Sequence, residues 1–159
     1  MVELDLVVEN IRRKFSKGCP SGIMIGWDVS RFFSALKSVF KGYTVLNQTD
    51  FNYSYCNTYD VNLGNNASGH YFVLTIKVSY IYDAFTMHIT RYISRRSGEV
   101  VTFDQCNEYK ELVEKVRSFL ADKAFREIQS DEMDVEVEGV ELELAEVPTV
   151  GKCLFDDFE

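Results

Sequence analysis

The residues of this chain that could carry out chemistry are few and widely spaced. The sequence holds two histidines, His70 and His88, and four cysteines. The cysteines are separated by 37, 50 and 47 residues: Cys19, Cys56, Cys106 and Cys153. Zinc sites usually contain at least one pair of ligands about two to four residues apart. The spacing therefore favours four free thiols, and we expect neither a metal site nor a cofactor.

The familiar catalytic motifs are also missing from the sequence. The glycines of Gly22–Gly26 lack the preceding strand and the lysine that a phosphate-binding loop requires, and neither Gly-x-Ser-x-Gly nor His-Glu-x-x-His occurs. Asp60, Asp83 and Glu99 could supply the carboxylates of a metal-dependent nuclease, but acidic residues near turns are common. We expect a non-enzymatic protein. An enzyme whose site is assembled from scattered residues is an alternative.

Charge is distributed unevenly along the sequence. Residues 1–98 hold 11 Lys and Arg against 7 Asp and Glu, whereas residues 99–159 hold 6 against 18. The net charge of the whole chain, −8, therefore comes from its C-terminal third. A surface of one sign attracts partners of the opposite sign and repels polyanions such as nucleic acids. This distribution makes a protein, rather than a nucleic acid, the expected partner.

Within residues 131–147, acidic residues alternate with apolar ones on both sides of Gly139. This pattern is typical of an edge strand or hairpin whose charges prevent aggregation. It is also typical of a docking surface for a basic partner, of a negative strip that competes with nucleic acid for a basic groove, or of a segment that folds only when bound. The residues expected to contact a protein partner here are Glu136, Glu138, Glu141 and Glu143.

The last residues of the sequence place two aromatic side chains among acids. Such an end is either a short docking peptide or a tail that packs its rings on the domain. For the first interpretation, the residues expected to contact the partner are Leu154, Phe155, Asp156, Asp157 and Phe158.

Binding of single-stranded DNA or RNA is the alternative binding function. Tyr71 and Tyr92 share the polar face of their strands, where aromatic rings can stack on bases. The basic residues that would accompany them are Arg12, Arg13, Lys14, Lys77, Arg91, Arg95 and Arg96. Arg91 occupies a position in its strand where the alternation would place an apolar residue. This predicts an ion pair with an acid such as Asp60.

Three helices are expected to position these residues. Apolar residues recur every three or four positions in residues 4–17 and 29–41, which predicts two amphipathic helices packed as a hairpin. Residues 105–129 show the same spacing. Thr102 and Gln105 fit a capping box at the start of this long helix.

Between the helices, apolar residues alternate with polar ones in residues 51–61, 71–82 and 85–93, and a short apolar run follows at 100–103. This alternation, with tight turns between the segments, predicts an antiparallel meander of three to four strands. The predicted fold class is therefore α+β. It comprises the N-terminal helical hairpin, the meander, one long helix packed on it and an acidic C-terminal β segment.

The length of 159 residues fits one domain. Residues 1–130 are expected to form it, residues 131–147 to dock on it as the acidic β segment, and residues 148–159 to form a short tail. A chain ending at Ser130 should then fold. An apolar content of 46% excludes a wholly disordered chain. No apolar run approaches the ~20 residues that span a bilayer, so we expect no membrane partner. A secretory signal begins with basic residues, whereas here acids precede the first basic residues. We therefore expect a cytoplasmic or nucleocytoplasmic protein.

No stretch of the sequence carries the signature of a known family. Small acidic α+β chains without catalytic motifs are frequent among viral accessory proteins and among inhibitors of toxins. The expected function is that of a non-enzymatic accessory or inhibitor-type protein that binds a protein partner through its acidic C-terminal surface. A strand edge left open would also allow a homodimer.

Overall fold

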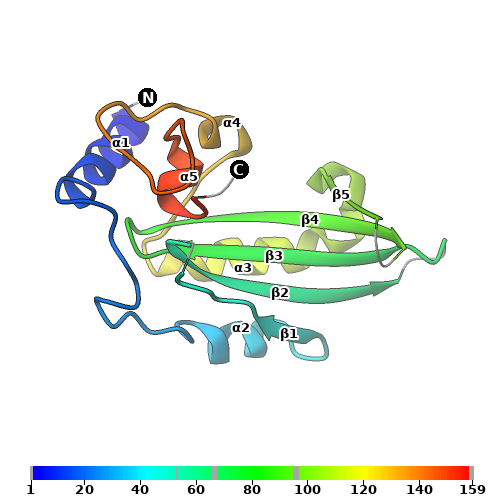
Figure 1. The fold of residues 1–159 in the computed structure, drawn as a ribbon. Coiled ribbons are helices and arrows are strands. Elements are labelled where there is room, and N and C mark those ends of the chain that lie inside the picture. Colours follow the sequence, from blue (N-terminus) through cyan, green and yellow to red (C-terminus); the bar gives the residue numbers. More distant parts are fainter. Residues whose placement is uncertain (1, 53, 66–67, 95–96, 158–159) are drawn as a thin grey trace.

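An antiparallel sheet forms the centre of the computed structural model, which describes residues 2–52, 54–65, 68–94 and 97–157 (Figure 1). Five strands follow one another in sequence order, and the short β6 (Arg126–Glu127) pairs with the fourth of them in parallel. The meander consists of β1 (Thr44–Asn47), β2 (Cys56–Asn65), β3 (Tyr71–Ser79), β4 (Ala84–Ser94) and β5 (Ser97–Val101). The predicted α+β class is confirmed, with more strands in the meander than expected.

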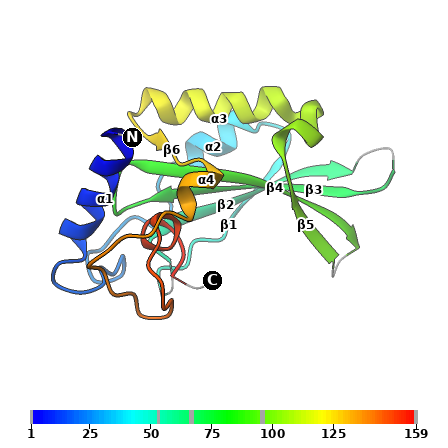
Figure 2. The same ribbon diagram turned by 90° about the horizontal axis from the view of Figure 1, so that it is seen from above.

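The two faces of the sheet differ because its strands alternate as predicted. The apolar side chains of β3 point into a core that also receives α2 (Phe33–Val39) and α3 (Lys110–Asp122). Figure 2 shows these two helices along the same side of the sheet. The opposite face carries polar side chains such as Thr75 and Lys77. α5 (Val150–Leu154) and the chain near it lie over one end of that face.

The long C-terminal helix starts as predicted and ends earlier. Thr102 and Gln105 form the expected capping box at the start of the 3₁₀ helix η1 (Phe103–Tyr109), which leads into α3. After α3, Ala124 adopts a left-handed conformation with φ of 66°. Such a conformation cannot continue a helix. The chain therefore leaves the helix and pairs β6 with β4, and Phe125 still reaches the sheet core.

The two N-terminal helices do not form the expected hairpin. The first, α1 (Val2–Lys14), buries Val7 and Ile11 in a second apolar core, whereas α2 packs its Leu36 into the sheet core. The second helix is also shorter than predicted. Phe32 stands just before it in a left-handed conformation with φ of 67°, so helical geometry begins only after this residue.

Residues 134–149 follow a less regular course than the predicted β segment. They run from α4 (Ser130–Met133) to α5, and their β structure is a single bridge between Glu136 and Thr149. Val137 and Val140 turn inward to the second core. The backbone carbonyl of Glu138 accepts a hydrogen bond of 2.9 Å from Arg12 Nε. The alternation of acidic and apolar residues here places Val137 and Val140 against the core that contains α1 and α5, and does not mark a pair of strands.

The second core joins the two ends of the sequence at one end of the sheet (Figure 1). The buried side chains that come from the C-terminal part of the chain are Val137, Val140, Val150, Cys153, Leu154 and Phe155. Residues 148–157 are therefore built into the fold and do not hang from it as a tail. Among the residues described, no helix has the length and apolar character needed to cross a lipid bilayer.

Candidate protein-interaction surface

The acidic loop, residues 134–147, covers the outside of the second core and displays its charges to solvent. Val137 and Val140 anchor it inward, while Leu144 is 53% exposed. The sequence of the loop has no Lys, Arg or His. Its exposed acidic side chains are Asp134, Glu136, Glu138, Glu141, Glu143 and Glu146. The loop therefore presents carboxylates beside apolar side chains, with no cation of its own to neutralise them.

A buried carboxylate holds the middle of the acidic loop in place. Asp157 is 3% exposed, and its carboxylate accepts hydrogen bonds from three successive backbone amides. These bonds come from Glu143 (2.9 Å), Leu144 (3.3 Å) and Ala145 (3.0 Å). Successive N–H groups that converge on one anion form a nest, and charge-assisted bonds of this kind are stronger than neutral ones. Asp157 therefore fixes the turn from which Glu143 and Leu144 project.

The hydroxyl of Tyr55 completes the surroundings of this carboxylate. It donates to Asp157 at 3.1 Å. Burial is the main cause that raises the pKa of Tyr55 above its ordinary value, with smaller contributions from Cys19 and Asp157. The phenol therefore stays protonated and acts as a donor. Among the described residues, the Asp157 carboxylate thus accepts from the Tyr55 hydroxyl and three backbone amides.

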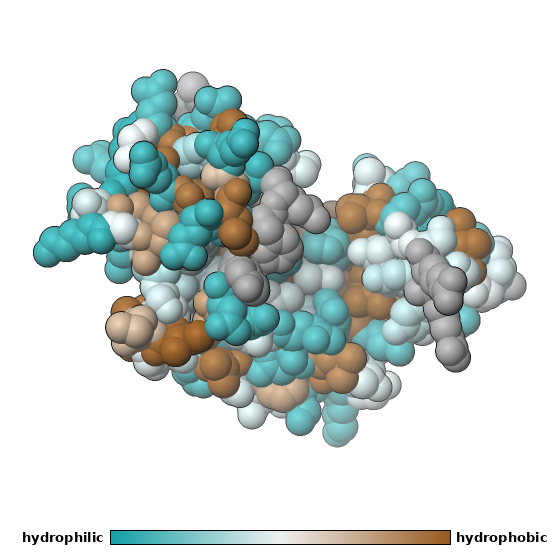
Figure 3. All heavy atoms as spheres, viewed as in Figure 1, coloured by the Kyte–Doolittle hydropathy of each residue, from teal (hydrophilic) through white to brown (hydrophobic). Residues whose placement is uncertain are grey.

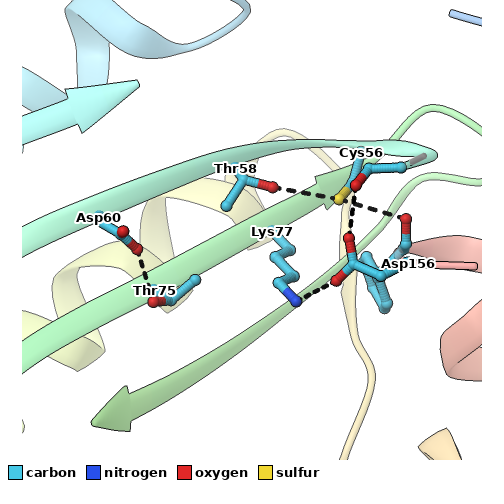
Figure 4. A network of polar contacts seen from close by, with 8 residues as sticks. Cys56, Thr58, Asp60, Thr75, Lys77 and Asp156 are labelled. Carbon is cyan, nitrogen blue, oxygen red and sulfur yellow. Dashed lines mark hydrogen bonds and ion pairs between the residues drawn. The ribbon is translucent and has the colours of Figure 1, made fainter. Parts of the chain in front are cut away.

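The neighbouring residues fasten the chain end to the sheet. The carboxylate of Asp156 accepts a hydrogen bond of 2.7 Å from Ser54 Oγ and forms an ion pair with Lys77 on β3 (Figure 4). The backbone N–H of Tyr55 donates to the Phe155 carbonyl at 2.6 Å. Because these contacts reach β3 and the segment before β2, the sheet itself positions the anchor of the acidic loop.

The residues predicted to contact a protein partner fall into two groups in the structure. The glutamates at 136, 138, 141 and 143 are exposed on the acidic loop. Leu154 and Phe155 lie in the second core, and Asp156 and Asp157 bond internally. The chain end up to Asp157 therefore packs on the domain and does not form a free docking peptide. Phe158 lies outside the described residues.

Those basic residues of the nucleic-acid alternative that the structure describes do not gather on one surface. Arg12, Arg13 and Lys14 end α1, whereas Lys77 on β3 is paired with Asp156. Arg91 on β4 forms its ion pair with Glu99 of β5. The expected partner was Asp60, which instead accepts a hydrogen bond of 2.7 Å from Thr75 Oγ1. Arg95 and Arg96 lie outside the described residues.

The polar sheet face and the C-terminal chain enclose a cleft of about 600 Å³ that contains His88 and Lys77. Burial, and then the charge of Lys77, lower the pKa of His88 from its ordinary value. In the described part of the chain, no three His, Cys, Asp or Glu side chains gather closely enough to hold a metal ion. The four cysteines are free thiols. Asp60, Asp83 and Glu99, considered together from the sequence, therefore form no metal-binding group.

One exposed feature was not identified from the sequence as a contact surface. Three consecutive apolar side chains between two glycines project into solvent, with exposed fractions of 60% for Ile23, 85% for Met24 and 58% for Ile25. The sequence signal is the unbroken apolar run in a segment bounded by turn residues. In Figure 3, hydrophobic side chains gather at the left edge, over the segment that joins α1 to α2.

No family model, no curated protein and no solved structure matches this chain.

Proposed function

We propose that this chain is a non-enzymatic binding protein that docks a basic protein surface on its acidic loop. The observation that carries the proposal is an exposed row of carboxylates on a backbone held by the buried Asp157. A preorganised loop loses little conformational freedom when it binds. Its field also attracts a basic partner over a distance and excludes acidic ones. Such a protein suits an accessory or inhibitor role.

The free thiols support a reducing compartment as the place where the protein acts. All four cysteines are free, and Cys56 and Cys153 are buried without a bridging partner. Free thiols persist in a reducing compartment. We therefore propose that the protein acts in the cytoplasm or nucleocytoplasm.

Charge neutralisation on the acidic loop tests the proposed function. The quadruple variant E136Q/E138Q/E141Q/E143Q removes carboxylates that are exposed, so the fold should remain intact. The wild-type chain and the variant are immobilised and exposed to a lysate of cells that express the protein. We expect the proteins that the wild-type chain captures to be absent from the fraction captured by the variant. The measurement is quantitative mass spectrometry of the captured proteins at low and physiological salt, because exposed charge pairs weaken as salt rises.

A control variant with the same change in net charge separates the loop from the overall charge. The substitutions D104N, E108Q, E111Q and D122N neutralise exposed acids of η1 and α3. We expect this variant to capture the same proteins as the wild type. If the loop variant retained them undiminished, or the control variant lost them equally, docking on the acidic loop would be wrong.

A further inference from the structure

The segment Ile23–Ile25, here called the apolar turn, is held outward by a rigid base. The backbone N–H of Trp27 donates to the Gly22 carbonyl at 2.8 Å, and that of Ile25 donates to the Ser21 carbonyl at 3.0 Å. Gly26 adopts the left-handed conformation, with φ of 67°, that closes the turn. The apolar side chains are therefore displayed by a closed, hydrogen-bonded turn.

Both ends of the apolar turn are tied to the second core. The backbone N–H of Gly22 donates to the Tyr80 hydroxyl at 2.9 Å. A Cβ at Gly22 would lie 2.7 Å from a ring atom of Phe51, so the backbone approaches this ring as closely as only glycine permits. On the other side, Trp27 Nε1 donates to Asn57 at 3.2 Å. These contacts hold the backbone of the apolar turn so that Ile23, Met24 and Ile25 remain exposed to solvent.

The apolar turn adjoins the acidic loop. Ile23 lines a hollow of about 150 Å³ together with Glu143 and Leu144 of the loop. Phe51 and the carboxylate-bearing Asp157 belong to the same lining. The lining also contains polar side chains such as Ser21 and Asn52. Its apolar side chains beside the Glu143 carboxylate suit the methylene stem and charged head of a lysine or arginine. Ile23 and Leu144 therefore connect the apolar turn and the carboxylates into one surface.

Resting on the proposed function, we infer that the apolar turn is the hydrophobic anchor of the docking surface and that the partner offers an amphipathic basic helix. Its apolar stripe would cover the apolar turn and Leu144. Its flanking lysines or arginines would reach the acidic loop, and one would enter the hollow beside Glu143. Complementary charge selects this occupant. A negatively charged bilayer would be repelled by the same carboxylates, and a second copy of this chain carries a net charge of −8.

A synthetic peptide tests the inference directly. The probe is a fluorescein-labelled helical peptide of about 18 residues with leucines on one face and lysines on the other. Its counterpart with glutamates in place of lysines is the specificity control. We expect the wild-type chain to bind the lysine peptide only, and I23S/M24S to weaken binding by about tenfold or more in fluorescence anisotropy. The control I93S/V100S alters exposed apolar residues of β4 and β5 and should bind as the wild type does.

The outcomes distinguish this inference from the proposed function. If I23S/M24S bound the peptide as tightly as the wild type while E141Q/E143Q bound it weakly, the apolar anchor would be wrong and the acidic docking surface would stand. If both variants bound unchanged, both ideas would fail. The inference would also be overturned if the wild type did not bind the lysine peptide. Sedimentation as a dimer that I23S/M24S abolishes, or binding to phosphatidylcholine vesicles, would assign the turn to self-association or to membranes instead.

Discussion

At the scale of single residues, one buried acid links the chain end to the displayed surface. The carboxylate of Asp157 accepts from three loop amides and from Tyr55, and it is nearly inaccessible to water. A buried donor that loses its acceptor costs about 1–3 kcal/mol because water does not replace it. The position thus contributes both to stability and to the shape of the acidic loop.

The substitution D157N tests this role. The amide of asparagine keeps the size of the side chain but replaces one acceptor oxygen with a donor, so at least one loop amide or the Tyr55 hydroxyl loses its partner. We expect the free energy of unfolding to fall by about 1–3 kcal/mol in urea titrations. The exposed D131N is the matched control and should change it by less than about 0.5 kcal/mol. Equal stabilities of the two variants would contradict the anchoring role.

At the scale of elements, α4 is fixed to β6 by an ion pair at its first turn. Arg126 Nη2 lies 2.8 Å from a carboxylate oxygen of Glu132, and the backbone N–H of Gln129 donates to the same carboxylate at 2.9 Å. The hydrogen bond from Arg126 is the largest cause that lowers the pKa of Glu132. This contact sets where the acidic loop begins.

The pH dependence of stability tests that contact. Because the folded-state pKa of Glu132 lies below its ordinary 4.5, its contribution is fully present above that value and is lost as pH falls through the folded-state pKa. We therefore expect E132Q to be less stable than the wild type at pH 7 and the difference to shrink in acid. The measurement is urea unfolding of both chains over an acidic pH series. A difference that stayed constant with pH would contradict the assignment.

At the scale of the whole molecule, two cores share one sheet. The first core lies between the sheet and α3. The second lies at one end of the sheet and is formed by α1, residues at the turns between strands and the C-terminal chain. Residues from positions 137 to 155 form a large part of the second core but none of the first. The two cores therefore depend on the C-terminal chain to different degrees.

A chain ending at Ser130 tests this dependence. It lacks the C-terminal side chains that cover α1, so we expect α1 to lose its packing while the sheet and α3 retain theirs. Hydrogen exchange should show rapid exchange of the α1 amides and continued protection in β3 and α3. The single substitution L154A, in the fully buried side chain of α5, should destabilise the full chain by about 2–5 kcal/mol. Full protection of α1 in the shortened chain would contradict the shared core and restore the expectation that residues 1–130 fold alone.

Local pattern was enough to predict the elements where one face of an element is buried along its whole length. The alternation of residues 71–82 predicts β3, and the capping box at Thr102 marks the start of η1, because both depend on neighbours in sequence. The exposure of the glutamates in the acidic loop also follows from composition, since uncompensated charge remains in water. The boundaries at Phe32 and Ala124 could not be predicted, because phenylalanine and alanine rarely adopt left-handed backbone and their residue type gives no sign of it.

The sequence by itself determined the α+β class, the uneven charge and the absence of familiar catalytic motifs, because these depend on residue type and short-range periodicity. Only the tertiary structure decided that the chain end is an anchor, that α1 packs with α5, and that the apolar turn lies beside the acidic loop. The contacts of α1 with α5, of Ile23 with the acidic loop and of Tyr55 with Asp157 join residues more than 100 positions apart. No local pattern encodes such a contact, since it arises when segments distant in sequence bury their apolar side chains against one another.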